Sequence, residues 1–276
     1  MSQRPEAARR EPQASEVVWV DGTLRPADAP VVRTDDSAYT EGRGCYTSVR
    51  IRAGAPRFAE RHVRRLVRGA QVLGLPAADP RRLRRALEEL AKAAFFGGEG
   101  VVRLSLSRDG DGALRVVGVP RDLGEDPPAW RAVTAPLPHP GALLAGGPKL
   151  TQRLLQALAS DAARAAGAEE ALLFDAAGYL VEGARTNVVA MRADGALCTP
   201  PTERGAVAGI ALEVASERLP ALVRRDLSRR DLFAARGVAV INAVRGARAL
   251  VALDGRPLGA DSGALAARLG AVLDDD

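Results

Sequence analysis

The spacing of apolar residues predicts two amphipathic helices in the first third of the chain. Over residues 59–75, apolar side chains recur every three or four positions, which is the spacing of one helix face. Residues 79–95 begin with an aspartate followed by a proline, the signature of a helix N-terminus. We therefore predict helices over both ranges.

Short apolar runs bounded by turn residues predict strands around these helices. The runs at 16–20 and 45–52 are separate strands, and the DGDG turn makes 100–119 a hairpin. In the second half, strands are predicted at 169–175, 179–183, 186–192, 196–200, 237–244 and 249–255, and helices from 149 to about 166, at 206–219 and at 262–273. Clustered strands with isolated helices predict an α+β or mixed α/β fold in two lobes.

The proline- and glycine-rich stretch over 120–148 marks a boundary between these lobes. We expect a small N-terminal α/β lobe over 16–137, an interdomain loop over 138–148 and a larger C-terminal lobe over 149–276. Residues 1–15 are polar and have no apolar signal-peptide core, so we expect a disordered leader there.

Composition favours a cytoplasmic enzyme over several other classes. Apolar residues make up 47% of the 276, yet no apolar run approaches membrane-spanning length. Two cysteines and two histidines are too few for a disulfide framework or a histidine-rich metal site. The net charge of +5 comes from arginines scattered among acids, which is typical of a solvated, ion-paired surface. We expect no nucleic-acid partner, no membrane and no metal.

Lysine is rare in this chain. Lys92 and Lys149 are its only lysines among 39 basic residues. Lys92, three positions after Glu89 in a predicted helix, is explained as a solvated or ion-paired cation. Lysine can form a Schiff base with an aldehyde, which arginine cannot, because its guanidinium stays protonated. Taken alone, Lys149 is better explained as a surface lysine at a helix N-terminus, and the downstream sequence reverses that preference.

An acidic motif lies about thirty positions after Lys149. Glu182 lies 33 positions later in an EG dipeptide, with Thr186 and Asn187 behind it. This pattern resembles the class IV aminotransferase family of fold type IV pyridoxal-phosphate enzymes. The resemblance implies that Lys149 holds pyridoxal phosphate as a Schiff base and that Glu182 pairs with its ring nitrogen. A carboxylate there keeps the ring protonated and able to accept electrons. Asn187 is expected beside the cofactor.

The resemblance runs from about residue 18 to 258, and three further matches within it concern the cofactor phosphate. ERHVRRL is similar to the family's His-x-x-Arg-Leu, which implies that Arg65 binds the phosphate and that His62 is structural. GAVAGIALE resembles a helix opening whose amides at Gly209, Ile210 and Ala211 would cap the phosphate. The family's usual threonine is Ala211 here. INAVRGA matches a second phosphate-side turn, through Asn242 and Ala243.

Three stretches favour one branch of the family, the lyases acting on 4-amino-4-deoxychorismate, which make p-aminobenzoate and pyruvate in folate biosynthesis. GRGCYTSVRI, KLTQRL and the INA turn are similar to lyase segments. By this resemblance Thr47 relays a proton near the leaving enolpyruvyl group, although an ordinary strand threonine explains it as well. A D-amino-acid or branched-chain aminotransferase, which passes the amino group to a 2-keto acid, is the alternative.

Two arginines depart from the lyase pattern. Arg43 replaces an aspartate, and Arg108 lacks the Arg-Gly-Tyr that usually follows. We expect Arg43 or Arg108 to bind the carboxylate of a small-molecule amine substrate. The family also implies a homodimer with its active site between the lobes. A basic binding protein that has lost its chemistry is a further hypothesis, and the presence of both Lys149 and Glu182 argues against it.

Overall fold

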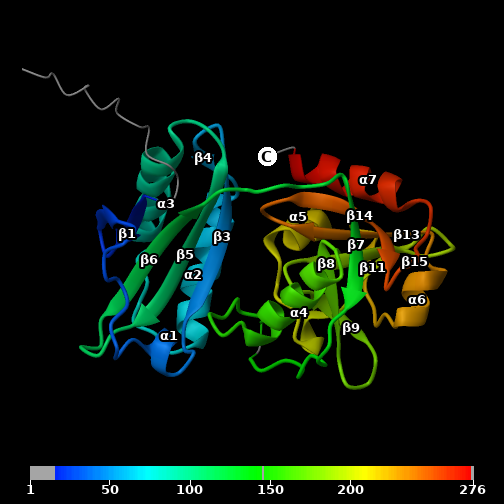
Figure 1. Ribbon diagram of the computed structural model, residues 1–276, viewed down its shortest axis with the longest axis horizontal. Coiled ribbons are helices and arrows are strands. Elements are labelled where there is room, and N and C mark those ends of the chain that lie inside the picture. The colour runs from blue at the N-terminus through cyan, green and yellow to red at the C-terminus, as the bar shows by residue number, and fades with distance from the viewer. Residues whose placement is uncertain (1–15, 145, 275–276) are drawn as a thin grey trace, which may run out of the picture.

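The chain folds into two lobes, each built on its own β-sheet (Figure 1). A computed structural model describes residues 16–144 and 146–274. The leader expected at 1–15 lies outside these residues. Helices and strands are mixed along the described chain, so the mixed α/β class predicted from the sequence is confirmed.

An antiparallel sheet forms the N-terminal lobe, with strand order β2-β1-β6-β5-β3-β4. Its strands are β1 (Val17–Val20), β2 (Thr23–Pro26), β3 (Cys45–Arg52), β4 (Ala55–Pro56), β5 (Gly100–Arg108) and β6 (Leu114–Arg121). The predicted strand over 45–52 and the predicted hairpin over 100–119 are therefore confirmed. Before β3 lies the short helix α1 (Ser37–Thr40).

Two helices cover one face of this sheet, α2 (Ala59–Val72) and α3 (Pro80–Phe95). The side chain of Asp79 accepts a hydrogen bond from the Arg81 amide, and Pro80 opens α3 as the sequence predicts. Side chains of β3 and β5 alternate between faces. Val49, Val102 and Leu104 enter the core with the helices, and the residues between them face the C-terminal lobe.

The C-terminal lobe holds a mixed sheet in the order β12-β11-β10-β13-β14-β7-β8-β9, with β15 beside β14. Its strands are β7 (Ala129–Thr134), β8 (Glu170–Phe174), β9 (Leu180–Gly183), β10 (Asn187–Met191), β11 (Leu197–Thr199), β12 (Leu222–Arg224), β13 (Gly237–Asn242), β14 (Gly246–Leu253) and β15 (Arg256–Pro257). Helices α4 (Leu154–Ala165), α5 (Ile210–Arg218), α6 (Arg229–Ala234) and α7 (Ser262–Asp274) pack around it, and a 3-10 turn spans Thr202–Arg204.

The chain enters the C-terminal lobe earlier than the sequence predicts. Strand β7 pairs in parallel with both β14 and β8, so it belongs to the C-terminal lobe. The chain passes between the two sheets over 122–128, before the predicted loop at 138–148. Proline and glycine content marks irregular backbone, but it does not reveal which sheet a short strand joins.

Two arginines, one in α2 and one just before it, join the lobes. Arg61 pairs with Glu213 and Glu217 of α5, both at 2.6 Å, and Arg57 donates to the carbonyl of Leu273 in α7. These contacts hold α5 and the end of α7 beside the start of α2. Within 16–144 and 146–274, no helix is long and apolar enough to cross a membrane.

Candidate active site

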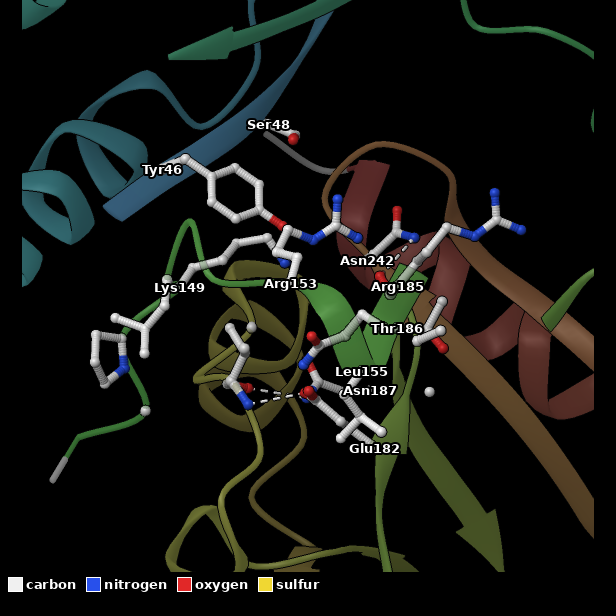
Figure 2. A pocket seen from close by; sticks show the side chains of 18 of the residues that line it. Tyr46, Ser48, Lys149, Arg153, Leu155, Glu182, Arg185, Thr186, Asn187 and Asn242 are labelled. Carbon is white, nitrogen blue, oxygen red and sulfur yellow. Dashed lines mark hydrogen bonds between the residues drawn. The ribbon is translucent and has the colours of Figure 1, made fainter. Parts of the chain in front are cut away.

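A cavity of about 790 Å³ lies between the lobes and is lined by both. Figure 2 shows Tyr46, Ser48 and Lys149 facing Glu182 and Asn187 across it. Seven residues that the sequence singles out as cofactor-binding reach this cavity. They are Lys149, Glu182, Arg65, Asn187, Gly209, Ile210 and, from the turn after β13, Ala243.

Lys149 lies on an extended segment, so the helix predicted to start there begins later. Its carbonyl accepts a hydrogen bond from the Tyr46 amide, and the Thr151 amide donates to Gly44, both at 2.9 Å. An isolated antiparallel bridge joins Leu150 to Cys45, and α4 begins at Leu154. Pairing with the start of β3 outweighs helix propensity here, and it directs the Lys149 amino group to within 5.1 Å of the Tyr46 ring centre.

Glu182 and Asn187 both hydrogen-bond to the backbone of Val207. A carboxylate oxygen of Glu182 accepts from the Val207 amide at 2.8 Å, and the Asn187 amide donates to the Val207 carbonyl at 3.0 Å (Figure 2). A Cβ atom on Gly209 would lie 1.8 Å from the Asn187 side-chain oxygen, so glycine is required there. The two side chains therefore fix the segment leading into α5.

Burial controls the charge of Glu182. Only 5% of the residue is exposed. Burial raises the pKa of its carboxyl to about 7, and the positive charge of Lys149 opposes this rise. A cationic ring nitrogen placed against Glu182 would favour the carboxylate further. The group is thus suited to pair with a protonated pyridine ring.

The phosphate end of the site combines Arg65 with the start of α5. No described side chain caps α5 at Gly209, which leaves its first amide groups available to an anion. Arg65 donates to the Ala208 carbonyl and has no carboxylate partner among the described residues. Ala211 follows in the helix with its side chain in the core, so it contributes through its backbone.

A turn after β13 completes this end. The side-chain oxygen of Asn242 accepts from the amides of Val244 and Arg245, at 2.9 and 2.7 Å. This Asx turn holds Ala243 against the cavity. The uncapped helix, the partly buried guanidinium, the glycine at 209 and the buried carboxyl of Glu182 together fit pyridoxal phosphate.

Thr47 does not face the cavity. Tyr46 and Ser48 line it, and alternation along β3 turns Thr47 toward α2. Its hydroxyl lies 2.5 Å from Nδ1 of His62, and both residues are buried. Burial, followed by the charges of Arg65 and Lys149, lowers the pKa of His62 well below its usual value. The pair joins the sheet to the helix, and Tyr46 and Ser48 bring the hydroxyls that β3 offers to the cavity.

The two arginines expected to bind the substrate carboxylate lie elsewhere. Neither Arg43 nor Arg108 is among the cavity residues. Arg43 lies in the loop before β3, 3.8 Å from Glu41. Arg108 ends β5 in step with Leu104 and Leu106, which face the helices. Besides Arg65, the arginines of this lobe that line the cavity are Arg103 and Arg121, and the motifs of the sequence pointed to neither.

A signal for Arg103 was present in the sequence. It is the one charged residue within the otherwise apolar and hydroxyl-bearing run GVVRLSLS, where a strand side chain has no reason to be charged unless that face meets water or a ligand. Val207 carries no such signal, because its contribution to the site is entirely backbone.

The comparisons with known proteins agree with this geometry. The model of the family described as amino-transferase class IV matches residues 44–253. A bifunctional aminodeoxychorismate lyase / D-amino acid transaminase from Mycobacterium tuberculosis is 30% identical, over 88% of this chain and 92% of its own.

Solved structures share the fold. A hypothetical aminotransferase from M. tuberculosis in its PLP-bound form has a TM-score of 0.80 at 24% identity, covering 94% of this chain and 97% of its own. A branched-chain aminotransferase from Thermoproteus uzoniensis with norvaline has a TM-score of 0.83 at 24% identity, covering 95% and 96%.

The chain therefore belongs to the class IV aminotransferase family. It has the family's fold type IV architecture and is a pyridoxal-phosphate-dependent enzyme. When bound, pyridoxal phosphate would be held by Lys149 at its reactive end, by Glu182 at its ring nitrogen, and by Arg65 with the α5 amides at its phosphate.

Replacing Thr47 distinguishes its two roles. We expect Thr47→Val to lower the free energy of unfolding by about 1–3 kcal/mol, because His62 Nδ1 loses its partner in the core. Turnover should stay close to that of the unmodified enzyme. Denaturant unfolding and steady-state kinetics measure the two effects, with Thr47→Ser as the control that keeps the hydroxyl. A stable Thr47→Val protein without turnover would restore the proton-relay role.

The raised pKa of Glu182 predicts a pH dependence in protein stripped of cofactor. Between about 4.5 and 7 the folded chain keeps a proton that the unfolded chain releases. The free energy of unfolding should therefore fall as pH rises through this range, by roughly 3 kcal/mol from this group. In Glu182→Gln the free energy of unfolding should not show this part of the decrease with pH. Equal pH profiles for both proteins, from denaturant unfolding, would contradict the assignment.

Proposed function

We propose that this enzyme is a 4-amino-4-deoxychorismate lyase that releases p-aminobenzoate and pyruvate. The observation that carries the proposal is the relative from M. tuberculosis, whose name includes this lyase activity and which aligns over 92% of its length. The KLTQRL segment after the cofactor lysine supports it, since Gln152 and Arg153 resemble the lyase pattern and line the cavity.

The residues present can carry out such an elimination. Pyridoxal phosphate supplies an electron sink for the carbon that bears the amine. Lys149, once released by the substrate amine, is placed to take the proton from that carbon. The ether bond to the enolpyruvyl group then breaks with its electron pair on the oxygen, the ring becomes aromatic, and the departing enolate takes up one proton to become pyruvate. Ser48 and Tyr46 offer hydroxyls on the side of the cavity nearest β3.

Amino-group transfer is the second candidate function. The same relative is also named a D-amino acid transaminase. In both reactions the substrate amine first takes the place of Lys149, and Lys149 then removes a proton from the carbon that bears the amine. Transfer differs in returning a proton to the cofactor and in requiring a 2-keto acid as acceptor, which gives an experimental distinction.

A homodimer is part of the proposal. Leu143 and Leu154 line the cavity yet are 72% and 70% exposed, and Leu137 and Leu158 add further exposed apolar surface beside them. Apolar surface of this kind at the rim of a site is suited to burial by a second copy of the chain. Light scattering on the purified protein measures the assembly.

The lyase assignment predicts turnover without an acceptor. Purified enzyme with pyridoxal phosphate and 4-amino-4-deoxychorismate, without keto acid, should form p-aminobenzoate and pyruvate in equal amounts over many turnovers. A transaminase would stop after one turnover per site. Absence of both products, from protein that binds the cofactor, would contradict the lyase and direct the assay to D-alanine with 2-oxoglutarate.

The two lysines provide a matched pair of variants. Lys149→Arg keeps the charge but cannot bond covalently to the cofactor, so we expect turnover to fall by about 100- to 10,000-fold with thermal unfolding little changed. Lys92→Arg, on the N-terminal lobe helix α3, should be fully active. Visible absorption measures cofactor binding in each. Normal turnover in Lys149→Arg would refute the role of this residue.

A further inference from the structure

A second carboxyl group is buried behind the cavity. Glu170, the first residue of β8, is only 1% exposed and is not among the cavity residues. One of its carboxylate oxygens accepts from the Thr186 hydroxyl at 2.8 Å, and the other accepts from the Ala171 amide at 2.9 Å. Burying a carboxyl group is costly unless hydrogen bonds offset the cost, so these two contacts show where Glu170 acts.

Glu170 contacts the turn between β9 and β10. The Gly183 amide closes this turn by donating to the Thr186 carbonyl at 2.8 Å. A Cβ atom on Gly183 would overlap the Thr186 hydroxyl and would lie 3.0 Å from a carboxylate oxygen of Glu170. Glycine therefore lets the Glu170 carboxyl lie directly against the residue that follows Glu182.

The same turn places two of the groups expected to hold the cofactor. Glu182 lies just before it in β9, and Asn187 begins β10 just after it. Both side chains hydrogen-bond to the backbone of Val207. Figure 2 shows them with Thr186 on the side of the cavity opposite Tyr46. A displacement of the turn would therefore move the carboxylate and the amide together.

Charge links the two carboxyl groups as well. Burial is the main cause of the raised pKa of Glu182, the charges of Lys149 and Arg153 oppose it, and the negative charge of Glu170 adds to it. Burial also raises the pKa of Glu170, which the charge of Arg185 and the hydrogen bonds to its oxygens oppose. Since both oxygens accept hydrogen bonds, these contacts favour the carboxylate form. Its charge then adds to the negative potential that Glu182 presents to a protonated ring.

We infer that Glu170 is a positioning residue for the cofactor ring, acting on Glu182 through Thr186 and the 183–186 turn. It does not touch the cavity and takes no part in the chemistry. The inference depends on the assignment of Glu182 to the ring nitrogen, and it holds for a lyase and for a transaminase. Loss of the Glu170 carboxylate should therefore weaken the contact with the ring nitrogen and leave the phosphate end, at Arg65 and α5, unchanged.

Two cofactors that differ at a single ring atom test this without turnover. The probes are pyridoxal phosphate and its 1-deaza analogue, which has a carbon in place of the ring nitrogen and so makes no hydrogen bond to Glu182. Absorption titration of the full-length protein, freed of cofactor, gives an affinity for each. In Glu170→Gln and in Thr186→Val, the preference for pyridoxal phosphate should fall by about 5- to 50-fold. The affinity for the analogue should change little.

Matched variants control for the hydroxyl and for the charge. Thr186→Ser keeps the hydroxyl and should retain the preference. Glu169→Gln removes the neighbouring carboxylate, which accepts from the Arg131 amide at 2.7 Å and has no contact with the turn through its side chain, so this variant should retain the preference too. Thermal unfolding shows that each variant is folded, and Thr186→Val serves if Glu170→Gln does not fold.

The outcomes separate this inference from the lyase assignment. An equal loss of affinity for both cofactors would show that Glu170 only stabilises the fold, and an unchanged preference would show that it does not act on Glu182. Either result would overturn the inference. A lyase assay that gives no product with the unmodified enzyme, while the preference falls in the variants as expected, would reject the proposed reaction and leave the role of Glu170 standing.

Discussion

The site depends on the backbone pairing between residues 44–46 and 149–151. Two backbone hydrogen bonds and the bridge between Leu150 and Cys45 attach the lysine segment to the start of β3 in the N-terminal sheet. The chain then continues from this segment into α4 of the C-terminal lobe. Gly44 makes this approach possible, since a Cβ there would lie 2.8 Å from the Thr151 hydroxyl and 2.9 Å from the Leu106 carbonyl. Lys149 is thus held where the two lobes meet, and the remaining groups are arranged around it.

Both lobes contribute charge to the cavity. The C-terminal sheet contributes the buried carboxyl of Glu182, and cations come from α2, β5 and β6 of the N-terminal lobe and from Lys149 and three arginines of the C-terminal lobe. The ion pairs of Arg61 with Glu213 and Glu217 hold α2 against α5. They keep Arg65, on the same helix, in register with the N-terminal end of α5. An anionic ligand between the lobes therefore strengthens an association that already exists in the folded chain.

The long periodic segments could be predicted from the sequence, and residue-specific geometry could not. Helices over 59–75 and 79–95 follow directly from apolar spacing, and Lys149 and Glu182 follow from a motif. The extended backbone at Lys149 could not be predicted, because distant pairing with β3 decides it. The same holds for Thr47 and Arg108. Alternation along a strand shows that each side chain points to the opposite face from the next residue, but only the fold shows which face lines the cavity. Elements such as β4 and α6 are too short to produce a pattern.

Alternation along β3 has a consequence for how such an enzyme can change. Positions 46 and 48 line the cavity, whereas 47 and 49 face the helix layer. Substitutions on the ligand side leave the packing of the lobe intact, and substitutions on the helix side leave the ligand's surroundings intact. One strand therefore lets selection act on specificity and on folding through separate residues. A scaffold with this property can acquire new substrates without losing stability.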